Sequence, residues 1–185
     1  MSRFDELKPL VNEWRNNCTR LYREYQRLPW FLSNCFKTFM GCPDTFKDGF
    51  GPEAENVPYI CPAVAEWNEE QEKFRLIALE HFTLEDWSFF GDGRFYFALR
   101  IFLESAPNTY PKQPFWFLLS AVAEDVSFNV RVQKTKTDFN VRLDSAASAD
   151  DLCEHLFSDL KHILVEEPLL RPEDSAGQFG FVKNK

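Results

Sequence analysis

Cys61 and His81 are residue types that could together form a nucleophilic catalytic pair. A cysteine attacks as its thiolate, so it needs a nearby base, and a carboxylate such as Glu80 or Glu66 could orient the histidine. No local sequence signature supports this combination, and cysteines of this kind usually serve as small apolar residues. A small hydrolase with its site between residues 41–62 and His81 therefore remains an alternative hypothesis.

Two patterns that could hold a metal ion are incomplete. Four positions of a calcium-loop template are filled, by Asp44, Asp48, Gly49 and Glu55. The third position is Phe46, which cannot act as a ligand. His155 and His162 are about two helical turns apart, which is too far for them to share a metal without further ligands. We therefore expect neither a metal nor a cofactor.

The sequence also lacks other signatures of enzymes. It contains no phosphate-binding P-loop and no GxGxxG loop. A metal-dependent nuclease would need an acid-x-Lys pair, but the nearest segment, EDVSFNVRVQK, has Val132 at the place of the second acid. These observations favour a non-enzymatic protein.

The tetrapeptide FNVR occurs twice, at residues 128–131 and 139–142. Two strands joined by a turn centred between Thr135 and Lys136 would place three apolar pairs on one face: Phe128 with Leu143, Val130 with Val141, and Val132 with Phe139. The opposite face would pair Asn129 with Arg142 and Arg131 with Asn140. We expect the apolar face to lie against the C-terminal helix.

The polar face of this hairpin is the candidate binding surface. Its residues are Asn129, Arg131, Lys134, Lys136, Asn140 and Arg142. Such a positive strip could dock an acidic protein or a phosphate, or it could be an ordinary solvated sheet face. A further alternative is a nucleic-acid accessory factor that uses the Arg131/Arg142 strip.

The net charge of −8 makes nucleic acid an improbable partner, because phosphate binding requires a positive field. The charge is uneven, with +3 over residues 1–40 and −8 over residues 41–90. Five cysteines without a CxxC motif, and an N-terminus without an apolar signal segment, favour the cytoplasm. No apolar run approaches the roughly 20 residues that a membrane helix needs, so we expect a soluble chain.

An N-terminal helix is predicted from about Pro9 to Leu28. Apolar residues recur there at steps of four and three, at Leu7, Val11, Trp14, Cys18, Leu21, Tyr25 and Leu28. This stripe could be a coiled-coil seam or the face of a helix that lies across a sheet. Pro29 should end the helix, and a second short helix should follow up to Met40.

Taken together, these patterns predict a single α+β domain over residues 1–168. Its parts are a helical segment at 1–40, an irregular loop at 41–62, an antiparallel sheet of about five strands at 73–144, and a C-terminal helix at 148–166 packed on one face. The strands should follow one another as a meander. Ser148 with Asp151 resembles a capping box. Residues 169–185 should form a flexible tail.

One segment resembles a known family. The run GRFYFALRIFLESAPNTYPKQPFWFLL is similar, through Tyr110, Pro111 and Pro114, to the YPxxP segment of ubiquitin-conjugating enzymes and RWD-type domains. The resemblance covers under a sixth of the chain. No cysteine lies between Cys61 and Cys153, and the HPN triplet is missing. The resemblance therefore implies a non-catalytic binding relative, and we do not assign the chain to the family.

These observations predict a protein-interaction or regulatory protein. Its contact surface would be the sheet face or the N-terminal helix, and its partner would be another protein, possibly a second copy of itself.

Overall fold

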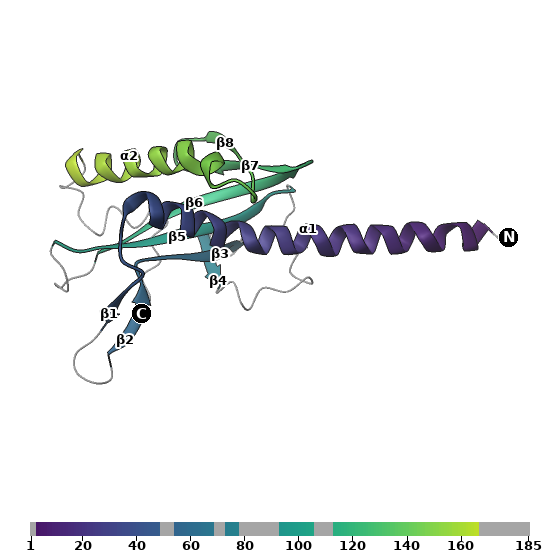
Figure 1. The fold of residues 1–185 in the computed structure, drawn as a ribbon, viewed down its shortest axis with the longest axis horizontal. Coiled ribbons are helices and arrows are strands. Elements are labelled where there is room, and N and C mark those ends of the chain that lie inside the picture. The colour runs from purple at the N-terminus through teal and green to yellow at the C-terminus, as the bar shows by residue number, and fades with distance from the viewer. Residues whose placement is uncertain (1–2, 49–53, 69–72, 78–92, 106–112, 167–185) are drawn as a thin grey trace.

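The computed structural model describes residues 3–48, 54–68, 73–77, 93–105 and 113–166. The elements are α1 (Arg3–Met40), β1 (Thr45–Asp48), β2 (Glu55–Pro58), β3 (Ile60–Asn68), β4 (Lys73–Ile77), β5 (Phe95–Leu103), β6 (Gln113–Glu124), β7 (Ser127–Val132), β8 (Thr137–Val141), a 3-10 turn (Ala146–Ala149) and α2 (Asp150–Glu166). Figure 1 shows an antiparallel sheet with a long N-terminal and a shorter C-terminal helix. The predicted α+β class is confirmed.

The main sheet has six strands in the order β4-β3-β5-β6-β7-β8. All neighbouring strands pair antiparallel. The expected simple meander is wrong at one point, because β3 is inserted between β4 and β5. From β5 to β8 the strands do follow one another as predicted.

Residues 41–62 are not an irregular loop. They contain the β1–β2 hairpin and the start of β3, and Phe46 of β1 packs against Tyr59 and Phe102 at ring-centroid distances of 4.9 and 5.1 Å. The clustered Gly and Pro residues obscured short strands that are stabilised by these aromatic contacts.

Pro62 lies within β3, where a sequence-based assignment would exclude a strand. The Phe102 amide donates to the Tyr59 carbonyl at 2.8 Å. Hydrogen-bonded pairs alternate along an antiparallel ladder, so the odd-numbered residues of β3 are the ones that form hydrogen bonds with β5. The nitrogen of Pro62 thus points away from β5, and the described residues of β4 pair with β3 from Val64 to Asn68. Between β3 and β5, the missing N–H donor therefore removes no ladder hydrogen bond.

Residues 3–40 form one helix rather than two. Pro9 lies well inside α1, beyond its first turn, and Pro29 does not end it. A proline in a helix interior costs about 3 kcal/mol. Next to Pro29, Leu28 and Leu32 are buried to 0% and 1% exposure, and burying each leucine side chain contributes about 1.5–3 kcal/mol. Packing on both sides of the proline offsets its cost.

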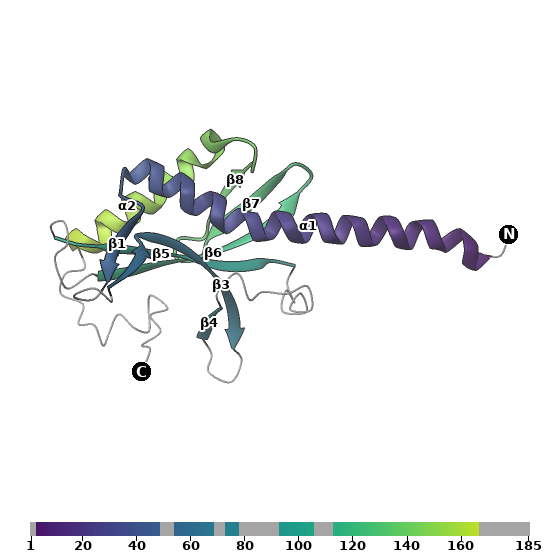
Figure 2. The ribbon, with the colours of Figure 1, turned by 60° about the horizontal axis from the view of Figure 1, so that its bottom comes forward.

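Both helices lie on the same face of the sheet (Figure 2). The C-terminal half of α1 crosses β3 and β5, and its Tyr25 makes edge contacts with Phe95 and Phe128 at 5.4 and 5.2 Å. The Tyr25 hydroxyl also accepts a hydrogen bond from the Ala123 amide at 2.9 Å. Of the 26 buried residues in the described core, 10 are Phe or Tyr, so large rings are a major part of it but do not outnumber the aliphatic side chains.

The C-terminal helix is confirmed, but its predicted cap is not. Helix α2 begins at Asp150, after the 3-10 turn. Ser148 Oγ instead accepts a hydrogen bond from the Arg142 amide at 2.8 Å, which ties the end of β8 to the turn. The predicted tail at 169–185 lies outside the described residues, as do Tyr110 and Pro111 of the YPxxP segment. Neither described helix combines the length and apolar character needed to cross a bilayer.

Candidate functional site

The FNVR hairpin forms, but its register differs by two residues from the predicted one. Phe128 pairs with Val141, Val130 with Phe139, and Val132 with Thr137. The turn spans the four residues 133–136, and Lys136 adopts a left-handed φ of 59° while its amide donates to the Val132 carbonyl at 2.9 Å. Because the shift is an even number of residues, the two faces of the hairpin stay as predicted.

The register places Arg131 opposite Asp138 rather than opposite Asn140. The guanidinium donates two hydrogen bonds to the carboxylate, at 2.8 and 2.7 Å. These bonds lower the pKa of Asp138. Asp138 is the residue that the sequence interpretation missed, and a correct register would have identified it, because opposite charges commonly pair across strands.

The rest of the strip is also engaged in local contacts. Arg142 donates to both carboxylate oxygens of Asp144, at 3.1 and 2.8 Å, and lowers the pKa of that carboxyl. Lys136 Nζ donates to Gln133 Oε1 at 3.3 Å, and Asn140 donates to Ser127 Oγ at 2.9 Å. Asn129 lies opposite Asn140, and Lys134 is exposed at the turn. Local carboxylates thus balance both arginines of the predicted surface.

The apolar face of the hairpin is buried as predicted, but it packs on both helices rather than on the C-terminal helix alone, because Phe128 contacts Tyr25 of α1. Phe128, Val130, Val132 and Val141 are buried, and Phe139 and Leu143 are half-buried against the core. Phe139 contacts the His155 ring of α2 at 5.2 Å, and His155 Nε2 lies 2.9 Å from Thr135 Oγ1. His155 therefore joins α2 to the hairpin.

Cys61 lies on β3 beside Arg100 of β5. The Arg100 Nε donates to the Cys61 Sγ at 3.1 Å, and the guanidinium stacks over the rings of Phe102 and Trp116 at 4.6 and 5.4 Å. His81 and Glu80 lie outside the described residues, so the predicted Cys61–His81 pair stays a prediction. Within the described ranges, no three His, Cys, Asp or Glu side chains gather as metal ligands would.

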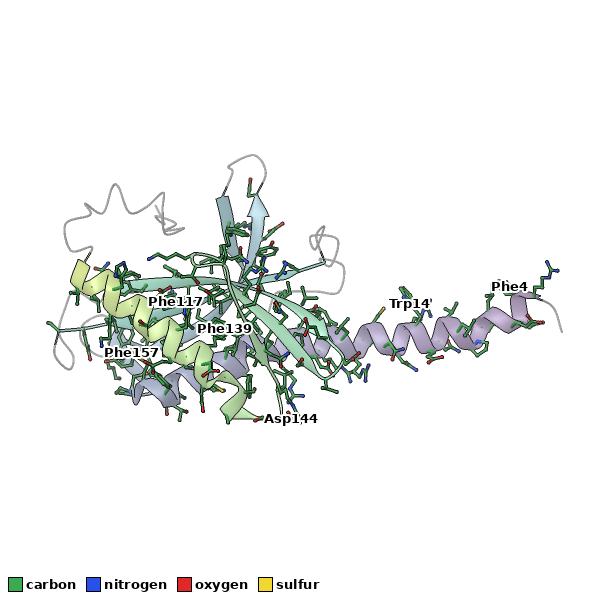
Figure 3. The ribbon with its side chains drawn as sticks, turned by 90° about the horizontal axis from the view of Figure 1, so that it is seen from above. Phe4, Trp14, Phe117, Phe139, Asp144 and Phe157 are labelled. Atoms are coloured by element: carbon green, nitrogen blue, oxygen red, sulfur yellow. The ribbon has the colours of Figure 1, made fainter. Side chains whose placement is uncertain are left out.

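The N-terminal part of α1 projects beyond the sheet, and Figure 3 labels Phe4 and Trp14 on this projection. Its large apolar side chains are exposed: Phe4 71%, Leu7 54%, Leu10 58%, Val11 46% and Trp14 64%. Phe4, Leu7, Val11 and Trp14 continue the heptad positions that Tyr25, Leu28 and Leu32 occupy in the core. We call these four residues the tip stripe; Leu10 lies beside it.

A second feature of α1 is a hollow of about 380 Å³. Its described wall consists of Asn16, Thr19, Arg20, Arg23, Glu24 and Arg27. These residues lie at helical positions outside the heptad stripe, so the hollow and the tip stripe are on different sides of the helix.

Comparisons of the chain with protein families, with curated proteins and with solved structures give no match.

Proposed function

We propose that this chain is a protein-interaction or regulatory protein whose contact surface is the tip stripe of α1. The observation that carries the proposal is the continuity of one heptad stripe from the core into solvent. Contiguous exposed apolar patches of this kind mark interaction sites in proteins.

The free energy of apolar burial favours a functional state in which a partner covers the tip stripe. Full burial of a large apolar side chain contributes about 1.5–3 kcal/mol. The side chains of the projection are about half exposed, so covering the exposed part of one of them contributes on the order of 1 kcal/mol. The five exposed residues of the projection would thus contribute about 5 kcal/mol, and a partner stripe as much again. This total is comparable to the roughly 4–15 kcal/mol that association costs in lost freedom.

The marginal stability of the projecting helical segment also favours a bound partner. Residues 3–17 form about four helical turns that project beyond the sheet, and their side chains are exposed apart from the half-buried Asp5. Helices of about 12–15 residues are marginal in water unless their apolar face is packed. A helical partner would stabilise the segment and shield its apolar residues.

The hairpin strip has weaker support as the contact surface. Arg131 already pairs with Asp138, and Arg142 already pairs with Asp144. An acidic partner would have to displace one of these carboxylates. The same ion pairs reduce the positive field on which a nucleic-acid interface would depend. The Arg100 contact of Cys61 does not supply the base that a thiol nucleophile needs.

A cytoplasmic location is part of the proposal. All five cysteines are free, including the buried Cys153, as expected for a protein of a reducing compartment.

The proposal is tested by comparing the proteins retained by immobilised chains from a native extract. In one variant, Leu7→Asp and Trp14→Asp place two carboxylates in the tip stripe. The matched control carries Asn12→Asp and Asn16→Asp, which add the same charge to exposed positions off the stripe. A third variant combines Arg131→Ala and Arg142→Ala.

We expect the stripe variant to lose specific partners while the other two retain them. Loss of the same partners from the Arg131/Arg142 variant, with retention by the stripe variant, would instead place the contact on the hairpin.

A further inference from the structure

We infer that the tip stripe binds the tip stripe of a second copy of this chain, with the two helices antiparallel. This inference rests on the proposed function, because it names the partner of the same surface.

The orientation follows from the side of α1 on which the stripe lies. Leu21, Tyr25 and Leu28 continue the stripe and face the sheet. A partner helix on the tip stripe must therefore lie on the same side of α1 as this chain's own sheet (Figure 2). A parallel copy would bring its sheet into the space that the first sheet occupies. An antiparallel copy places the two sheets at opposite ends of the helix pair.

A specific register covers all four residues of the tip stripe. In antiparallel helix pairs, a positions of one helix meet d positions of the other. The layers are then Val11 with Trp14 of the second copy, Leu7 with Cys18, and Phe4 with Leu21. Cys18 and Leu21 are half-buried, so each retains surface that a partner can cover. The arrangement is two-fold symmetric, as in most homodimers.

The end of each helix would reach the β6–β7 turn of the other copy. This turn lies beside the point where α1 leaves the sheet, because Tyr25 contacts both Ala123 and Phe128 (Figure 1). The turn carries Val126, which is 79% exposed. Phe4 of the second copy would cover Val126, so two exposed apolar side chains meet.

The charges near this junction are complementary. Glu124 and Asp125 are exposed at the β6–β7 turn, and Arg3 precedes Phe4 at the helix end. Arg3 of the second copy would therefore lie near two carboxylates.

Along one flank of the helix pair, two like charges come near each other, because Lys8 approaches Arg15 of the second copy. The ion pair of Lys8 with Asp5, at 2.7 Å, reduces that repulsion.

The first arm of the test is analytical ultracentrifugation of the full chain over a wide range of concentrations. We expect a monomer–dimer equilibrium that Trp14→Asp weakens at least about tenfold and Asn12→Asp leaves unchanged. A chain that remains monomeric at every concentration would overturn the inference. The partner comparison above would still decide the proposed function separately.

The second arm is cross-linking with a short bifunctional maleimide, followed by mass spectrometry. In the antiparallel register the two Cys18 residues are separated by about 11 residues of helix, roughly 16 Å, so the wild-type chain should not link through them. The variant Leu7→Cys should form a 7–18 link between copies and hence a covalent dimer, whereas Asn16→Cys should form no covalent dimer through Cys18, because a 16–18 link can form only within one chain.

Links of position 7 to 7, or of 18 to 18, would overturn the antiparallel arrangement. Sedimentation of the Leu7→Cys variant checks that it still forms the dimer.

Discussion

Trp14 and Leu28 occupy the same heptad position of α1, two heptads apart, yet Leu28 is buried to 0% exposure whereas Trp14 remains 64% exposed. The same side-chain pattern thus serves two environments along one helix. The C-terminal half of the stripe binds the sheet, and the N-terminal half leaves an apolar surface in solvent. Substitutions along the stripe should therefore divide into two classes.

The first prediction concerns this division. Leu28→Ala should lower the free energy of unfolding by about 2–5 kcal/mol, because it removes a buried side chain and leaves a cavity. Leu7→Ala should leave the unfolding free energy of the monomer almost unchanged, because Leu7 makes no core contact. Urea denaturation at low protein concentration measures both. Equal losses would mean that the projection is packed in the isolated chain.

The second prediction concerns the FNVR hairpin. Val141 is fully buried, so Val141→Ala should destabilise the fold by about 1–3 kcal/mol. The adjacent Asn140 is exposed, and Asn140→Ala should change stability by less than about 0.5 kcal/mol. Thermal unfolding of the two variants provides the comparison. A larger effect at Asn140 would contradict the assigned faces.

The third prediction concerns pH. The hydrogen bonds from Arg131 lower the pKa of Asp138 below its ordinary value of 3.8. A carboxyl with a lowered pKa in the folded state stabilises the protein above its unfolded-state pKa, and this contribution is lost as pH falls through the folded-state value. Asp138→Asn should therefore be slightly less stable than the wild type at neutral pH.

The difference should be small, because the pair is partly solvated, and it should disappear in acid. Melting temperatures measured from neutral pH down to about pH 2 test this. A difference that grows as the pH falls would have the wrong sign.

The fourth prediction concerns thiol reactivity. Burial raises the pKa of Cys153 from 9.0 to about 12. Since the thiolate is the reactive form, Cys153 should resist iodoacetamide at neutral pH until the protein unfolds. Peptide mapping after graded denaturant should show Cys153 labelled together with global unfolding. Rapid labelling in the native state would show that α2 opens independently.

Much of the fold could be predicted because the patterns are local. The heptad stripe predicted a helix within α1, and alternating apolar residues predicted the two faces of β7 and β8. The errors lie where tertiary contacts override local signals. Pro29 is held inside a helix by the burial of Leu28 and Leu32, and Pro62 fits a strand because its nitrogen faces away from the β5 ladder.

The candidate surface was harder to predict. The hairpin faces depend only on alternation and were correct, but the register depends on the turn, where Lys136 takes a left-handed conformation that a lysine rarely adopts. That register gives Arg131 its partner Asp138 and weakens the predicted positive strip. The sequence also left open whether the α1 stripe is a core face or a coiled-coil seam. The exposed and buried fractions show that it changes from solvent to core along its length.

Hydrogen–deuterium exchange, resolved by peptide, tests the central claim most directly. Amides of residues 3–17 should exchange rapidly in dilute protein and become protected as the concentration rises or when a partner isolated by the extract comparison is added. Peptides covering residues 127–142 should not change. Protection of residues 127–142 with no change at residues 3–17 would contradict the assignment of the tip stripe as the contact surface.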